Sequence, residues 1–125
     1  RNFPLFEAIS AQAMLRMTSF TAQNLTNIAW AGATSAFTDR PLLASIAAEF
    51  LSKLPDTNPQ NLSNTAWAFA TLGIVHEPLL AAISAESRRR LHEYDPQALS
   101  NMAWAYATLG INDAQLMAAI SAEAI

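Results

Sequence analysis

Apolar and small side chains recur at intervals of three and four residues along most of the chain, which is the spacing of an α-helix with one buried face. Between residues 59 and 72, for example, the apolar side consists of Leu62, Ala66 and Phe69, and most of the polar side chains lie away from it. The pattern predicts three such helices, at about 22–35, 59–72 and 96–109. It predicts four others, at about 2–17, 41–53, 78–91 and 114–125. No segment alternates with period two, so the fold class that we predict is all-α.

Residues suited to helix ends stand at several of these boundaries. Thr21, Asn58 and Asp95 precede the first set of helices as candidate N-caps, and proline follows the latter two at the first helical position. Gly73 and Gly110 stand where a glycine can end a helix in a left-handed conformation. The loops are therefore only a few residues long, which is typical of antiparallel helix pairs.

The whole pattern repeats every 37 residues. Three copies of the phrase Leu-[Ser/Thr]-Asn-x-Ala-Trp-Ala contain Trp30, Trp67 and Trp104. Units that repeat without insertion offer each neighbour the same surface, so we predict an α-solenoid of antiparallel helix pairs. Within a single repeat domain, 1–125, we expect a partial repeat at 1–17, followed by repeats at about 18–54, 55–91 and 92–125. Because the chain begins and stops inside a repeat, we interpret it as a fragment of a longer array.

Composition narrows the range of functions. The hydrophobic fraction is 52% and the charged fraction only 14%, as expected for helices that are covered on both sides. The net charge of −3 gives no strong overall attraction to polyanions. Cysteine is absent, which excludes disulfides and thiolate metal sites, and no apolar run approaches a membrane span. No catalytic motif is present, so we predict a non-enzymatic protein without cofactor, metal or small-molecule substrate.

The repeated phrase resembles the octatricopeptide and heptatricopeptide repeats, helical-repeat families of organelles that often occur with FAST-kinase-like or RAP domains. The resemblance is strongest at 62–70 and 99–107, and the period extends over nearly all of residues 1–125. It implies a right-handed superhelix located in a mitochondrion or chloroplast. It also implies binding of single-stranded RNA, in RNA processing, stability, translation or ribosome assembly.

An alternative function belongs to a different class. The acidic balance and the apolar composition favour a scaffold that holds protein subunits within a large organellar assembly, such as a ribosome or a photosynthetic complex. Charge on the face that would meet RNA distinguishes the two hypotheses, because RNA binders usually present a positive surface.

The invariant stripe of the first helix in each unit has two interpretations. It pairs asparagine with tryptophan three residues later, as in Asn64 and Trp67, and such pairs can stack on bases and hydrogen-bond to them. Alternatively, a tryptophan that is identical in every unit fills a gap between units, and the asparagine pairs with a buried neighbour. We favour the structural interpretation, because side chains that read a sequence should differ between units.

A neighbouring stripe differs most between units and is the better candidate for reading bases. RNA-binding repeat proteins place one or two readers per unit on one helix, one base per unit. This assigns the base-reading positions to Asn24, Ile28, Asn61, Thr65, Ala98 and Met102. The alternative, that the same positions vary because they are free surface or pack between helices, stays equally open.

Three cations share one position late in the second helix of each unit. Arg16, Lys53 and Arg90 would form a ladder that can contact phosphates if neighbouring units stack about 10 Å apart. A cation near a helix C-terminus is also favoured by the helix dipole without any partner. We consider this second explanation somewhat stronger.

Overall fold

The computed structural model describes residues 4–124, which form seven α-helices and no strand. The helices are α1 (Pro4–Leu15), α2 (Ala22–Thr34), α3 (Arg40–Ser52), α4 (Pro59–Leu72), α5 (Glu77–Arg89), α6 (Pro96–Thr108) and α7 (Ala114–Ala124). The all-α prediction is therefore confirmed, and most helix ends lie within two residues of the predicted ones. The predicted helix start at residue 2 and the predicted end at residue 125 lie outside the described residues.

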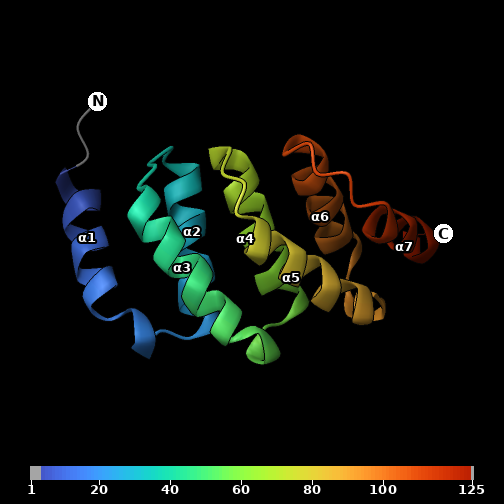
Figure 1. Ribbon diagram of the computed structural model, residues 1–125, viewed down its shortest axis with the longest axis horizontal. Helices are drawn as coiled ribbons and strands as arrows, with labels where there is room; N and C mark the ends of the chain where they lie inside the picture. Colours follow the sequence, from blue (N-terminus) through green and yellow to red (C-terminus); the bar gives the residue numbers. More distant parts are fainter. Residues whose placement is uncertain (1–3, 125) are drawn as a thin grey trace.

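The helices form two rows. In the A row, α2 packs against α4 and α4 against α6, and in the B row α1, α3, α5 and α7 pack against one another in the same order. Each A helix also contacts the B helix that follows it. The helix pairs succeed one another in chain order, so α1 and α7 lie at opposite ends of the molecule (Figure 1).

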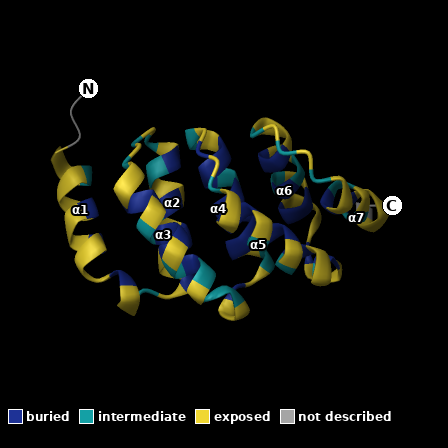
Figure 2. Cartoon of the chain, in the orientation of Figure 1, coloured by how far each residue is buried: buried dark blue, intermediate teal, exposed yellow. Residues whose placement is uncertain are grey.

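Buried small residues let the A helices approach closely. Ala66 and Ala68 of α4 have no exposed surface, and neither has Ala105 of α6. Larger side chains such as Leu62 and Phe69 fill the space between the two rows. Burial is concentrated where helices face one another, whereas α1 is mostly exposed (Figure 2).

The predicted N-caps are confirmed. The side chains of Thr21, Asn58 and Asp95 each accept a hydrogen bond from the backbone N–H three residues later. Asn58 and Asn61 also form a reciprocal capping box, in which the Asn61 side chain accepts from the Asn58 N–H. These bonds satisfy N–H groups that the first turn of a helix leaves without partners.

A short 3₁₀ turn follows α1, α3 and α5 and was not predicted. The turns are η1 (Met17–Ser19), η2 (Leu54–Asp56) and η3 (Leu91–Glu93). Side chains at the ends of the B helices bond back to the segments that follow the preceding B helices. Lys53 Nζ donates to the carbonyl of Thr18 at 3.4 Å, and Arg90 Nη1 donates to the carbonyl of Thr57 at 2.9 Å. Each cation thus satisfies a carbonyl just before the A helix of its own unit.

Candidate functional site

The most distinctive surface feature is a row of tryptophans along the A helices. The rings of Trp30 and Trp67 lie 6.2 Å apart between centroids, at an angle of 28°. Trp67 and Trp104 are also 6.2 Å apart, at 33°. Trp30 and Trp104 are each 46% exposed, and Trp67 between them is partly buried. We call these three residues the tryptophan row.

This geometry agrees with the structural interpretation in that the tryptophans pack between units, and Trp67 also packs against the core. The rings do touch from one unit to the next, but they do so at the surface rather than in the core. The core position is taken by the neighbouring apolar stripe, in which Leu62 and Phe69 are fully buried. Half-exposed aromatic rings in a regular row offer faces on which a planar ligand can stack.

Side-chain amides accompany the tryptophan row, one turn closer to the N-terminus of each helix. Gln23 Nε2 donates to Asn27 Oδ1 at 2.8 Å, and Gln97 Nε2 donates to Asn101 Oδ1 at 3.0 Å. In the middle unit, the side-chain amides of Gln60 and Asn64 form no hydrogen bond to any described residue. These six residues form the amide row, which contains donors and acceptors but no charge.

The stripe that we predicted to read bases lies mostly inside the A row. Asn61, Thr65, Ala98 and Met102 are between 0% and 7% exposed. Thr65 forms a hydrogen bond with Thr26 of α2 at 3.0 Å. Asn61, Thr65 and Met102 pack inside the A row, so a base could not reach them without separating the helices, whereas Ala98 lines a small pocket. Their variation between units reflects packing against different neighbours.

The remaining two members of that stripe, Asn24 and Ile28, belong to α2, which is the first A helix among the described residues. Asn24 is exposed and its side chain belongs to the capping box of α2, where it accepts from the Thr21 N–H at 3.0 Å. Ile28 is partly buried and lines an apolar groove beside α1. The six residues are therefore not brought together as one exposed reading surface.

Two of the three cations in the predicted ladder form ion pairs within the protein. Lys53 pairs with Glu49 at 2.9 Å, and Arg90 pairs with Glu86 and Glu93 at 3.3 Å each. Both also donate to a backbone carbonyl just before the A helix of their own unit, as described above. Arg16 is exposed and forms no ion pair with a described residue. Neutralised cations of this kind stabilise the stacking of units more readily than they attract phosphates.

The helices of the A row carry no charged residue at all. Their sequences, from Ala22 to Thr34, Pro59 to Leu72 and Pro96 to Thr108, contain neither acids nor bases. The tryptophan and amide rows therefore form a neutral surface. A ligand held there would be bound by stacking and hydrogen bonds, with little contribution from phosphate contacts.

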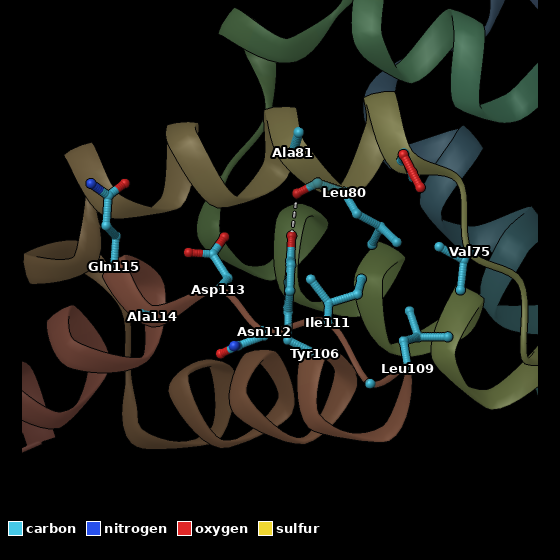
Figure 3. A pocket seen from close by; sticks show the side chains of 12 residues that line it. Val75, Leu80, Ala81, Tyr106, Leu109, Ile111, Asn112, Asp113, Ala114 and Gln115 are labelled. Atoms are coloured by element: carbon cyan, nitrogen blue, oxygen red, sulfur yellow. Dashed lines mark hydrogen bonds between the residues drawn. The ribbon is translucent and has the colours of Figure 1, made fainter.

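A second candidate surface is an apolar pocket near the C-terminal end of α6. It has a volume of about 680 Å³ and lies where the start of α5 meets the loop between α6 and α7 (Figure 3). Val75, which is 51% exposed, and Leu109 line it, and Tyr106 forms part of one wall. The Tyr106 hydroxyl donates to the carbonyl of Leu80. Burial raises the pKa of this hydroxyl, so it is not poised to act as a base.

Two carboxylates also line this pocket, and one of them has a structural role. Asp113 Oδ1 accepts from the Leu116 N–H at 2.9 Å and thereby caps α7, while Oδ2 accepts from the Ser84 hydroxyl at 2.5 Å. Burial alone would raise the pKa of Asp113. The two hydrogen bonds and nearby Arg88 outweigh burial, so the pKa is lowered.

Within residues 4–124 no helix has the length and apolar character needed to cross a membrane. No group of three or more metal-ligating side chains lies close together in the same part of the chain.

Two rows of packed helices, one of them with a neutral aromatic surface, define an all-helical domain. The chain belongs to the family described as "Tbc2 translation factor, N-terminal domain", whose model matches residues 3–121. No curated protein matches the chain.

The family match corrects the resemblance on which the sequence analysis relied. The chain matches the Tbc2 translation factor domain, so its assignment to the octatricopeptide or heptatricopeptide repeats is wrong. The residues behind that resemblance include Leu62, Ala66 and Ala68, which are fully buried between helices. Such positions are constrained by close helix packing, which many helical proteins share, and so they do not identify one family.

Proposed function

We propose that this chain is a non-enzymatic segment of a translation factor that binds single-stranded RNA, and that the tryptophan row stacks its bases. The observation that carries the proposal is the row of Trp30, Trp67 and Trp104 at equal 6.2 Å spacings, in which the two outer rings are exposed and the middle one is partly buried. Base–aromatic stacking is the main sequence-tolerant contact in proteins that bind single strands.

The rings form a continuous aromatic surface. Neighbouring centroids are 6.2 Å apart, the distance of aromatic rings in contact, so bases would stack on the exposed parts of the rings rather than between them. A strand that follows the row would meet one ring for each unit, with the amide row beside it.

The family supports a role in translation, because its printed description is that of a translation factor. The organellar location and the right-handed twist expected from the sequence rested on the overturned resemblance alone, and they are not part of this proposal. We do propose that the pairs form a solenoid with a period of 37 residues. The successive contacts within the A row and within the B row support it.

The test is binding of unstructured RNA oligomers, followed by fluorescence anisotropy and by quenching of tryptophan emission. Trp67→Leu should weaken binding by roughly tenfold, since one lost stacking contact costs ~1–3 kcal/mol. Val75→Ala provides the matched control, because Val75 is exposed but lies at the apolar pocket. Equal affinities of the wild type and Trp67→Leu, or no binding at low salt, would contradict the proposal.

A protein scaffold is the second candidate function, and the apolar pocket favours it. Pockets of ~300–1,000 Å³ with mainly apolar walls commonly receive ligands or side chains, and this one has about 680 Å³. A protein partner seated there would be lost on Val75→Asp and retained in Trp67→Leu. RNA binding would show the opposite dependence on the two variants.

A further inference from the structure

Two interfaces within the A row differ at several equivalent positions, and one of these differences changes a hydrogen bond between side-chain amides. Between α2 and α4, Asn61 is 3% exposed and its Nδ2 donates to Gln23 Oε1 at 2.8 Å. One period later, between α4 and α6, the equivalent residue is Ala98. Alanine cannot reach Gln60, which is the counterpart of Gln23.

A polar pocket of about 280 Å³ lies at this second interface. Ala98 forms part of its wall, together with the amides of Gln60, Asn64, Gln97 and Asn101. The carboxylates of Glu93 and Asp95 lie at the same pocket. We call it the amide pocket. Its volume is slightly below the ~300 Å³ at which pockets for drug-sized ligands begin, so it suits a single ring system.

Several polar atoms in the amide pocket are available to a ligand. The side-chain amides of Gln60 and Asn64 form no hydrogen bond to any described residue. Asp95 uses Oδ1 to cap α6, at 2.8 Å from the Ala98 nitrogen, and its Oδ2 accepts no hydrogen bond from the described residues. The pocket therefore offers two free amides, each with a donor and an acceptor, and one free carboxylate oxygen.

This set of groups matches one kind of nucleobase edge. Adenine and cytosine each place an amino group beside an unprotonated ring nitrogen, and a primary amide pairs with both atoms at once. A carboxylate accepts from the same amino group. Guanine also carries an exocyclic amine, beside its N1–H, and a carboxylate can accept from both groups. Uracil has no amine and presents a carbonyl oxygen on each side of its ring N–H, which the carboxylates of Asp95 and Glu93 would repel.

We propose that the amide pocket receives one base that carries an exocyclic amine, and so excludes uracil, from a strand lying on the tryptophan row. Asn64 is one helical turn before Trp67, so a base in the pocket is adjacent to the stacking surface. The inference rests on the proposed function, since it names the base that the same RNA-binding face selects.

The experiment compares four RNAs of equal length, a uridine tract and the same tract with one central adenine, cytosine or guanine. The wild type should bind at least one RNA that contains an amine-bearing base about tenfold more tightly than the uridine tract. The separate adenine, cytosine and guanine RNAs show which of these bases is taken.

The decisive variant is Ala98→Asn, which fills the amide pocket as Asn61 fills the equivalent position. It should reduce the preference to less than about twofold and leave the affinity for the uridine tract unchanged. Ser100→Asn is the matched control, because Ser100 is exposed on the same helix and does not line the pocket. If Ala98→Asn fails to fold by circular dichroism, Asn64→Ala tests the same loss of preference.

The outcomes separate the inference from the proposed function. Equal binding of all four RNAs by the wild type, or an undiminished preference in Ala98→Asn, overturns the amide pocket and leaves RNA binding intact. If no RNA binds while the protein is folded, both proposals are overturned.

Discussion

The residue just after each A helix has a left-handed backbone conformation, but only two of the three units have a glycine at this position. Gly73 and Gly110 adopt φ values of 70° and 71°, and Ala36 in the first unit adopts 56°. A residue with a side chain pays about 1–2 kcal/mol for a left-handed conformation. We therefore expect Ala36→Gly to raise the free energy of unfolding by about 0.5–1 kcal/mol, after the extra chain entropy of glycine is subtracted.

Urea denaturation of the two proteins measures this difference directly. Gly73→Ala is the matched reverse substitution, and it should lower the free energy of unfolding by about 1 kcal/mol. No atom lies within 4 Å of a Cβ built at Gly73, so conformation rather than crowding causes the loss. A stabilising effect of Gly73→Ala would contradict this explanation.

Individual residue roles were predictable from the sequence where they depend on local geometry. Thr21, Asn58 and Asp95 cap helices as expected, because a cap involves only the next three residues. The exposure of Trp30 and Trp104 was not predictable in the same way. An identical residue in every unit indicates a repeated environment, but not whether that environment is core or surface.

Asp113 makes stability depend on pH in a direction that follows from its lowered pKa. Its ionised form is favoured in the folded protein, so its contribution is complete above the unfolded pKa of about 3.9. The contribution is lost as pH falls through the lower folded pKa. Asp113→Asn keeps a capping side chain but removes the charge. Its deficit in free energy of unfolding should shrink between about pH 6 and about pH 3.

Urea denaturation across that pH range, on the wild type and Asp113→Asn in parallel, gives the deficit at each pH. Because the wild type differs from the variant only in this one charge, other titrating groups largely cancel in the comparison. A deficit that stays constant from about pH 6 to about pH 3 would show that the charge of Asp113 does not contribute.

At the scale of the helix, period and boundaries were predictable but the direction of packing was not. A helical projection orders the stripes of α4 around its axis, yet it does not state which stripe meets the preceding helix. The structure places Asn61 and Thr65 against α2, while Gln60 and Trp67 reach the surface. The varying stripe is thus an interface in which each unit is fitted to its neighbour.

The hydroxyl pair between α2 and α4 tests this packing. Thr26 and Thr65 are 2% and 0% exposed and are joined at 3.0 Å. Thr65→Val leaves the Thr26 hydroxyl buried without that partner, so we expect a loss of about 1–3 kcal/mol in the free energy of unfolding. The double variant Thr26→Val with Thr65→Val should recover most of it, because no polar group is then unsatisfied. Additive losses in this double-mutant cycle would show that the two hydroxyls do not interact.

For the whole molecule, the distribution of charge decides which forces can hold RNA. The A row is neutral, Lys53 and Arg90 are engaged by carboxylates, and the net charge is −3. Salt dependence measures this distribution, because the logarithm of the affinity for single strands falls with the logarithm of salt concentration by about 0.7 for each phosphate neutralised. Stacking on the tryptophan row predicts a slope shallower than about −1.

The competing model, in which Arg16, Lys53 and Arg90 each contact a phosphate, predicts a slope near −2. Anisotropy titrations from low to moderate salt distinguish the two values, and the variant Lys53→Gln with Arg90→Gln sharpens the comparison. If the slope is shallow and the variant leaves it unchanged, the RNA is held by rings and amides. A slope near −2 that becomes shallow in the variant would show that the RNA binds at the ends of the B helices and not on the A row.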